Sequence, residues 1–163
     1  MDPFITRDLQ EIAPDLIETL RAAGLKMATA ESCTGGNIAH HLTLVPGCSD
    51  VYNGGVVSYA NSAKEEVLGI DAGLIERHGA VSEEVVRAMA EGACRLFHTE
   101  CAVATSGIAG PGGGSDDKPV GTIWTAAVTP RGTFSELYRL VGPRSEIIDK
   151  ATLLVLRLLI NNL

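Results

Sequence analysis

The stretch "ATAESCTGGNIAHHL", residues 28–42, places a nucleophilic hydroxyl directly before a helical pattern. Ser32 ends a strand-like segment, and Gly35 and Gly36 fall in the first turn of the helix that follows. A glycine inside a helix costs about 1 kcal/mol relative to alanine, so two of them in one turn need an explanation. Without side chains they let a ligand approach the free amides of the helix start. This arrangement suits acyl transfer, in which a hydroxyl attacks a carbonyl and amides hold the oxyanion.

The same stretch has a purely structural explanation, namely a serine or threonine N-cap followed by a tight turn. Cys33 is a second nucleophile in the segment, but side chains alternate in an extended chain, so its thiol points away from the Ser32 hydroxyl. We therefore interpret Cys33 as a core residue.

The stretch "SYANSAK", residues 58–64, holds a lysine in an unfavourable electrostatic position. Ser62 and Glu65 have the spacing of a capping box, which puts Lys64 in the first turn of a helix. The helix dipole and partial burial both favour the neutral amine there, and a neutral lysine can take the proton of a serine. Tyr59, at a strand end, could relay or orient that proton. The alternative is a solvated lysine beside a half-buried tyrosine.

A glycine-rich stretch, "SGIAGPGGGSDDKPVG" at residues 106–121, follows a buried apolar segment. Its backbone amides and its tolerance of positive φ suit a cradle for phosphate or carboxylate. It contains neither the P-loop pattern nor G-x-G-x-x-G. A flexible loop also explains this composition, although the end of a buried strand is where α/β sheets place ligands.

The histidines and cysteines show no metal-binding or disulfide spacing, since the sequence has no H-E-x-x-H and no C-x-x-C. We therefore expect neither a metal nor another cofactor. The sequence also lacks G-x-S-x-G, which speaks against an α/β-hydrolase.

Helical patterns alternate with apolar, strand-like segments along the chain, and the last two strands are expected to form an antiparallel hairpin that turns at "TPRG". This order predicts a single-domain α/β/α sandwich over residues 1–163, with a mixed, largely buried sheet. Pro14 is expected to kink or delay the first helix. We expect helices at 8–23, 37–45, 62–69, 71–78, 81–100 and 144–163, and strands at 25–30, 51–60, 101–107, 122–128 and 133–141.

The composition favours a cytoplasmic protein of one domain, because 163 residues are 45% hydrophobic and the N-terminus shows no secretion signal. A net charge of -7 disfavours a nucleic-acid partner. The longest apolar run, at 151–160, is interrupted by Arg157 and is too short for a bilayer, which takes about 20 residues. We therefore expect no membrane partner. The run is apolar around most of its helical circumference, which burial in the core or an interface would explain; we expect a homodimer.

The three chemical stretches, in this order, resemble the CinA C-terminal domain family, whose characterised activity is nicotinamide-nucleotide amidase (PncC, or NMN deamidase). The matching text includes "AESCTGG", "NGGVVSYANSAKEEVLGI", "HGAVSEEVV" and "SGIAGPGGGSDDKPVGTIW", and it runs from residue 28 to about residue 145. The resemblance implies hydrolysis of the carboxamide of nicotinamide mononucleotide (NMN) to nicotinate mononucleotide and ammonia, without a metal. It implies Ser32 as nucleophile, Lys64 as base and Tyr59 as a polar partner.

The resemblance also implies a pocket for this small nucleotide. Glu31 and Thr34, beside the nucleophile, would shape it, and the glycine-rich loop and the amides of Gly35 and Gly36 would line it. The residues that we expect to bind substrate are Glu31, Thr34, Gly35, Gly36, Ser106, Gly107, Gly110, Gly112 and Arg144.

The chain departs from the family pattern at several positions. Cys48 stands where the family has serine, Pro143 stands in place of an acid, and Ile148 or Asp149 falls where a second arginine is usual. These departures motivate an alternative function, a nucleotide- or partner-binding module of the competence/damage-inducible type with weak or no amidase activity. A third hypothesis is amidase activity on a different small carboxamide.

Overall fold

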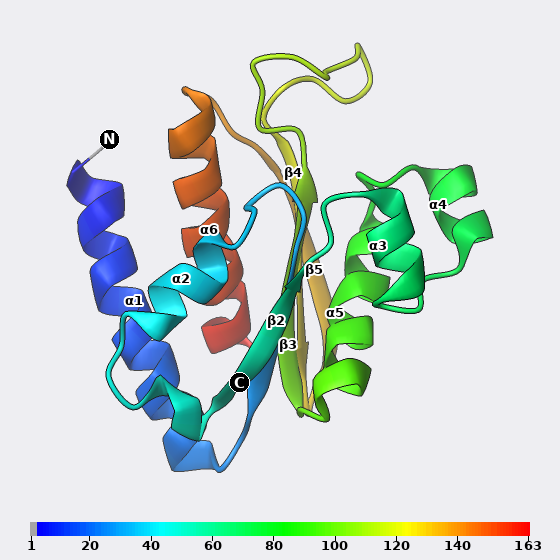
Figure 1. Ribbon diagram of the computed structural model, residues 1–163. Helices are drawn as coiled ribbons and strands as arrows, with labels where there is room; N and C mark the ends of the chain where they lie inside the picture. Colours follow the sequence, from blue (N-terminus) through cyan, green and yellow to red (C-terminus); the bar gives the residue numbers. More distant parts are fainter. Residues whose placement is uncertain (1–2) are drawn as a thin grey trace.

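The computed structural model describes residues 3–163 and has three layers, with helices on both faces of one sheet (Figure 1). The predicted α/β/α sandwich with a mixed sheet is confirmed. The strands are β1 (Met27–Glu31), β2 (Tyr52–Val57), β3 (Cys101–Gly107), β4 (Thr122–Thr129) and β5 (Gly132–Arg139). The α-helices are α1 (Pro3–Ala23), α2 (Asn37–Thr43), α3 (Asn61–Glu66), α4 (Ala72–His78), α5 (Glu83–Phe97) and α6 (Arg144–Asn161), with a 3₁₀ turn at Cys48–Asp50.

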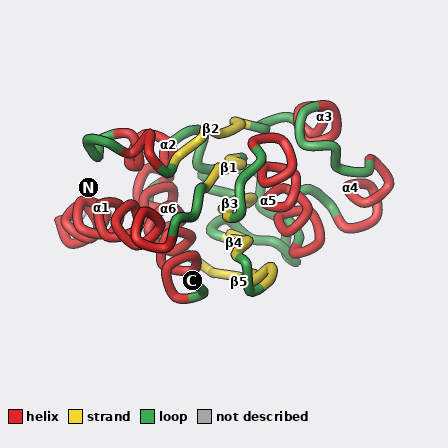
Figure 2. Tube along the Cα trace, turned by 90° about the horizontal axis from the view of Figure 1, so that it is seen from below, coloured by secondary structure: helices red, strands yellow, loops and turns green. Residues whose placement is uncertain are grey.

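The strands follow the order β2-β1-β3-β4-β5 across the sheet. β1 pairs in parallel with both β2 and β3, whereas β4 and β5 continue the sheet in antiparallel pairing. The predicted hairpin is confirmed, since Thr129 pairs with Gly132 across its turn. Figure 2 shows α1, α2 and α6 on one side of the strands and α3, α4 and α5 on the other.

Each face of the sheet packs against its own set of helices. The alternate residues of β1 and β3 that face α5 are alanines, which allow that helix to lie close to the strands. The opposite face carries larger side chains, among them Met27 and Val103, against α1 and α6. Nine residues of α6 are buried between α1 and the sheet. Burial within the domain therefore explains the apolar circumference of this helix, and the homodimer stays a prediction.

Several predicted boundaries were wrong. Pro14 lies inside an uninterrupted α1, whose apolar face packs into the core on both sides of the proline. The α2 helix ends at Thr43, two residues early, and β2 covers only 52–57. The predicted capping box fails because Ala60 occupies the N-cap of α3 and Ser62 lies within the helix. By contrast, Ser82 accepts the Val85 amide and caps α5 as expected.

Within residues 3–163, none of the helices is both long enough and apolar enough to cross a membrane.

Candidate active site

The predicted chemical residues meet at the carboxyl ends of the parallel strands. β1 and β3 are neighbours, but the connection after β1 leads to β2 and the connection after β3 leads to β4 on the opposite side. Such a divergence opens a crevice where α/β sheets bind ligands. A cavity of about 220 Å³ lies there. Six of the predicted site residues line it, namely Ser32, Tyr59, Lys64, Ser106, Gly107 and Arg144.

Ser32 and Lys64 form the polar pair at the centre of this cavity. Ser32 directly follows β1, and its amide donates to the carbonyl of Thr105 at 3.0 Å, which fixes the backbone against the end of β3. The Lys64 Nζ lies 3.2 Å from the Ser32 Oγ. The amine also contacts the carbonyl oxygens of Ser58 at 2.8 Å and of Tyr59 at 3.4 Å. The predicted nucleophile and base therefore lie within hydrogen-bond distance.

Lys64 is 1% exposed, which rules out the alternative of a solvated surface lysine. It lies in the last turn of α3, so the predicted position in the first turn of a helix is wrong, and burial rather than the helix dipole accounts for its lowered pKa. Burial lowers the pKa of the Lys64 amine below its usual 10.5 because the charged form loses hydration. A larger fraction of the amine is then neutral, as a general base requires.

Tyr59 and Arg144 lie together at the mouth of the cavity. Tyr59 is 61% exposed, and its hydroxyl accepts a hydrogen bond from Arg144 Nη2 at 3.0 Å. Arg144 Nη1 donates to the carbonyl of Gly110 at 2.8 Å. Arg144, the first residue of α6, thus ties the segment after β2 to the glycine-rich loop. Tyr59 touches the lysine through its carbonyl, while its hydroxyl is bound by the arginine.

Glu31 lies on the opposite face of the sheet from Ser32, which corrects the expectation that it shapes the pocket. Adjacent strand residues point to opposite faces, so the Glu31 carboxylate turns toward the start of α2. It is 1% exposed and accepts the amides of Gly36, Ile38 and Ala39 at 2.8–3.0 Å. Thr34 is also buried on this side, where its hydroxyl donates to Glu31 at 2.7 Å. Both residues fix the turn after Ser32.

The Gly35 and Gly36 amides are also engaged within the protein, contrary to the prediction that they receive substrate. Gly35 N–H donates to the Ser32 carbonyl at 3.1 Å, and Gly36 N–H donates to Glu31. The two glycines have φ values of 58° and 102°, a left-handed conformation that side chains disfavour. The tight turn between β1 and α2 therefore explains them.

The glycine-rich loop contributes only its beginning to the cavity. Ser106 and Gly107 end β3 and line the cavity, and the Ser106 hydroxyl donates to the Ala80 carbonyl at 2.7 Å. Gly110 is buried and contributes its carbonyl to Arg144, whereas Gly112 is exposed and does not line the cavity. The rest of the loop extends beyond the strand ends (Figure 1).

Cys33 is confirmed as a core residue. Its side chain is 6% exposed and packs with Ala109, Ile123 and Ile147. Burial raises the pKa of the thiol to about 12, which disfavours the thiolate form. Although Cys33 borders the cavity, it is a poor nucleophile compared with the serine beside Lys64.

Sequence reasoning missed several residues that line the cavity, namely Asn61, Ala80, Val81 and Ala109. Asn61 lies between Tyr59 and Lys64, so its place in the same short stretch was the available signal. The turn before α5, which brings Ala80 and Val81, carries no chemical signature. Asp149, one of the two positions where the family resemblance implies an arginine, is buried and accepts from Asn37 of α2 at 3.1 Å, on the side of the sheet away from the cavity.

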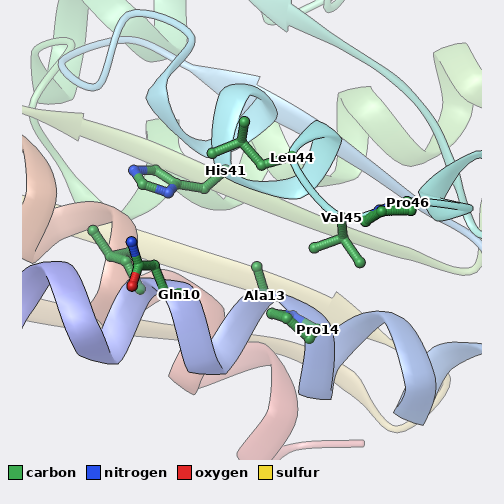
Figure 3. A pocket seen from close by; sticks show the side chains of 8 residues that line it. Gln10, Ala13, Pro14, His41, Leu44, Val45 and Pro46 are labelled. Atoms are coloured by element: carbon green, nitrogen blue, oxygen red, sulfur yellow. The ribbon is translucent and has the colours of Figure 1, made fainter.

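A second hollow, of about 330 Å³, lies between α1 and α2 (Figure 3). Its lining is mostly apolar and includes Ala13, Pro14 and Val45, with His41 as its single titratable side chain. It brings together no nucleophile and base, so we place the chemistry in the smaller cavity. Across the described residues 3–163 there is no group of three or more His, Cys, Asp or Glu that could hold a metal ion.

Comparisons with known proteins agree on one family. The family model described as CinA C-terminal domain matches residues 9–163. A "CinA-like protein" from Mycolicibacterium vanbaalenii is 52% identical over 138 residues, which are 84% of this chain and 33% of that protein. A "Putative competence-damage inducible protein" from Caldanaerobacter subterraneus is 44% identical over 146 residues, 90% of this chain and 35% of that protein. The chain thus spans about a third of the length of these relatives.

Solved structures show the same fold. The competence/damage inducible protein CihA from Agrobacterium tumefaciens is 40% identical, with a TM-score of 0.92 and coverage of 94% of each chain. A competence-damaged protein (CinA) superfamily protein from Escherichia coli is 30% identical, with a TM-score of 0.93, and covers 100% of this chain and 94% of its own.

Proposed function

Because the chain belongs to the CinA C-terminal domain family, we propose that it hydrolyses the carboxamide of NMN by a serine–lysine mechanism, releasing nicotinate mononucleotide and ammonia. The observation that carries the proposal is the 3.2 Å contact between Ser32 Oγ and a Lys64 amine that is almost fully buried. The lysine has no ion-pair partner within residues 3–163, which supports a role for the neutral amine.

The backbone orients Lys64 for proton transfer. A neutral amine has two N–H groups and one lone pair. The Ser58 and Tyr59 carbonyls accept the two N–H groups, so the lone pair is left to face the Ser32 hydroxyl. Ser32 then attacks the carboxamide carbon, its proton moves to Lys64, and the carbonyl electron pair moves onto oxygen. The Cys33 and Thr34 amides, which donate to no backbone carbonyl in residues 3–163, are candidates to hold this oxyanion.

Collapse of this intermediate completes the acylation. The Lys64 ammonium returns its proton to the amide nitrogen, the C–N bond breaks, and ammonia leaves an ester on Ser32. Water then attacks the ester carbon and gives a proton to Lys64. The lysine returns this proton to the Ser32 oxygen as the ester bond breaks, and nicotinate mononucleotide is released. Each proton taken by Lys64 is returned in the same half-reaction, so no metal or cofactor is called for.

The charged groups around the cavity fit an anionic nucleotide. Arg144 uses two of its five N–H donors on Gly110 and Tyr59, so the others are available to a phosphate at the mouth. The cytoplasm, where pyridine nucleotides are recycled, suits this activity, and we propose a homodimer as the assembled form.

The test is ammonia release from NMN by the purified protein in the presence of EDTA. We expect release that is insensitive to EDTA and abolished in Ser32→Ala. Release that persists in Ser32→Ala would contradict the mechanism. If the folded protein binds NMN by calorimetry but releases no ammonia, the competence/damage-inducible binding module is favoured instead. A panel of other small carboxamides separates a different amidase from both.

A further inference from the structure

Ser58 follows β2 and lies beside Ser32 on the same face of the sheet. The β1–β2 pairing ends at Glu31 and Val57, so the next residues in register are Ser32 and Ser58. The Ser58 amide donates to the Glu31 carbonyl at 2.9 Å and continues the parallel pairing. Side chains in register on neighbouring parallel strands point to the same side, with strands about 4.8 Å apart. The Ser58 side chain therefore enters the layer that holds Lys64.

The Ser58 hydroxyl is unusual because it is fully buried and has no hydrogen-bond partner. It is the one buried side-chain nitrogen or oxygen atom of this kind in the described part of the chain. A buried hydroxyl without a partner is unfavourable and calls for a specific explanation. Ser106, the neighbour of Ser32 on the β3 side, differs because its hydroxyl is satisfied by the Ala80 carbonyl.

We infer that Ser58 is a positioning residue whose hydroxyl accepts the third N–H of Lys64 when that amine becomes protonated. The inference rests on the serine–lysine mechanism proposed above. After Ser32 has transferred its proton, Lys64 is an ammonium with three N–H groups, while the Ser32 Oγ is bonded to carbon and accepts more weakly. Ser58 already contacts Nζ through its carbonyl at 2.8 Å and its hydroxyl is bound to nothing else, and we assign to this hydroxyl a rotation that lets it accept from the ammonium. Ser58 gains and loses no proton.

The unpartnered hydroxyl makes stability and activity separable in Ser58→Ala. Its removal breaks no hydrogen bond of the resting protein, so the melting temperature is expected to stay unchanged or rise. The kcat for NMN is expected to fall about 10- to 100-fold, the range for a hydrogen bond to a charged group, with KM unchanged. The apparent pKa of the basic group in the kcat profile should also shift downward. The other titratable groups around the cavity, Cys33, Tyr59 and Arg144, are unaltered in this variant.

A second measurement tests Ser58 without NMN. A fluorophosphonate forms a bond between Ser32 Oγ and phosphorus, fluoride leaves, and the serine proton passes to Lys64. The labelling rate, followed by mass spectrometry across pH, should fall in Ser58→Ala by a similar factor. Ser58→Cys, which nearly keeps the volume but accepts hydrogen bonds weakly, should also be slow. Thr129→Ala removes a buried hydroxyl at the far end of β4 and should label like the wild type.

The outcomes distinguish the two proposals. Labelling of Ser32 without ammonia release from NMN would overturn the proposed substrate, while the labelling rates would still test Ser58. Ser58→Ala that labels and turns over like the wild type at every pH would overturn the inference and leave the amidase intact. A lowered melting temperature in Ser58→Ala would also overturn it, because the hydroxyl would then be structural. No labelling of the wild type would overturn both.

Discussion

Burial sets the protonation of Lys64, the base of the proposed mechanism. A charged ammonium without an ion pair is costly in a site with little water, and residues 3–163 offer Lys64 only neutral oxygen partners. The neutral amine is therefore favoured over the form that an exposed lysine adopts. The lowered pKa of Lys64 follows from its position, which the side chain reaches from α3.

Both the activity and the stability of the protein should change with pH as Lys64 titrates. Activity requires the neutral amine, so kcat should rise with pH through an apparent pKa below 10.5. Between the folded pKa and 10.5 the unfolded chain binds more protons at this lysine than the folded protein does. Lys64 therefore makes the free energy of unfolding rise with pH across that window. Above a pH of about 10.5 the lysine is neutral in both states and no longer destabilises the folded protein.

Both effects can be measured against Lys64→Met. Chemical denaturation at several pH values should give a smaller rise of stability with pH in this variant than in the wild type, and ammonia release should be lost. A variant that retains the wild-type rate and its pH profile would remove Lys64 from the role of base.

Alternation along β1 explains which residues of "AESCTGG" the sequence could place. The prediction that Cys33 is a core residue is confirmed, although Cys33 borders the same cavity as Ser32. The same alternation puts Glu31 on the face opposite Ser32, yet its proximity in sequence and the family resemblance suggested the pocket. A buried glutamate six residues before the helix start is also an ordinary way to satisfy amides, and the sequence does not distinguish the two roles.

At the scale of elements, the turn from β1 to α2 holds Ser32, the proposed nucleophile, in place. The Glu31 carboxylate accepts hydrogen bonds from three amides of this segment, and the Gly35 amide donates to the Ser32 carbonyl. The turn needs left-handed backbone at both glycines, so their identity follows from backbone conformation rather than from the space around a ligand.

Replacing Gly36 with alanine should test this assignment. The φ of 102° is strained for alanine, and a Cβ there would meet only Val57 at an ordinary 3.6 Å, so the cost comes from the backbone. We expect a loss of about 1–2 kcal/mol in the free energy of unfolding. Gly112→Ala is the matched control, since Gly112 has no positive φ and nothing within 4 Å, and should change stability by less than about 0.5 kcal/mol. Equal stabilities of the two variants would contradict a strained turn.

At the scale of the molecule, Arg144 joins parts of the site that are far apart in sequence. Its guanidinium holds Tyr59 after β2 and Gly110 after β3 from the first turn of α6. The mouth of the cavity is therefore assembled by three connections at one edge of the sheet.

Arg144→Gln should raise the KM for NMN about 10- to 100-fold, because a charge-assisted bond to phosphate is lost. The effect on kcat should be smaller, since Arg144 contacts Gly110 and Tyr59 rather than Ser32 or Lys64. Steady-state kinetics on NMN and on its dephosphorylated riboside separates the two effects, and the riboside should be insensitive to the substitution. Arg131→Gln, in the exposed turn between β4 and β5, is the charge-matched control and should behave like the wild type. If the KM for the riboside rises as much as the KM for NMN in this variant, Arg144 does not bind the phosphate.

Fold class and the main elements could be predicted because strand alternation, helix periodicity and the Ser82 cap are local signals. The sequence also predicted that Ser32 and Lys64 lie in one site, and they do; this prediction needed the family resemblance as well as the position of each residue. The sequence predicted only partial burial of Lys64. It could not predict which face of the sheet Glu31 lies on, the nearly complete burial of Lys64 or the unpartnered hydroxyl of Ser58, since these depend on how β1, β2 and α3 pack together.

The contacts that orient Lys64 have a further consequence for how the protein tolerates mutation. In the resting state its two acceptors besides Ser32 are main-chain carbonyls, of Ser58 and Tyr59. Every amino acid carries a carbonyl, so an exchange at either position leaves an acceptor in place as long as the strand end keeps its path. Exchanges at these two positions are therefore expected to change the rate of the proposed reaction while leaving both acceptors in place, whereas exchanges of Ser32 or Lys64 are expected to abolish it.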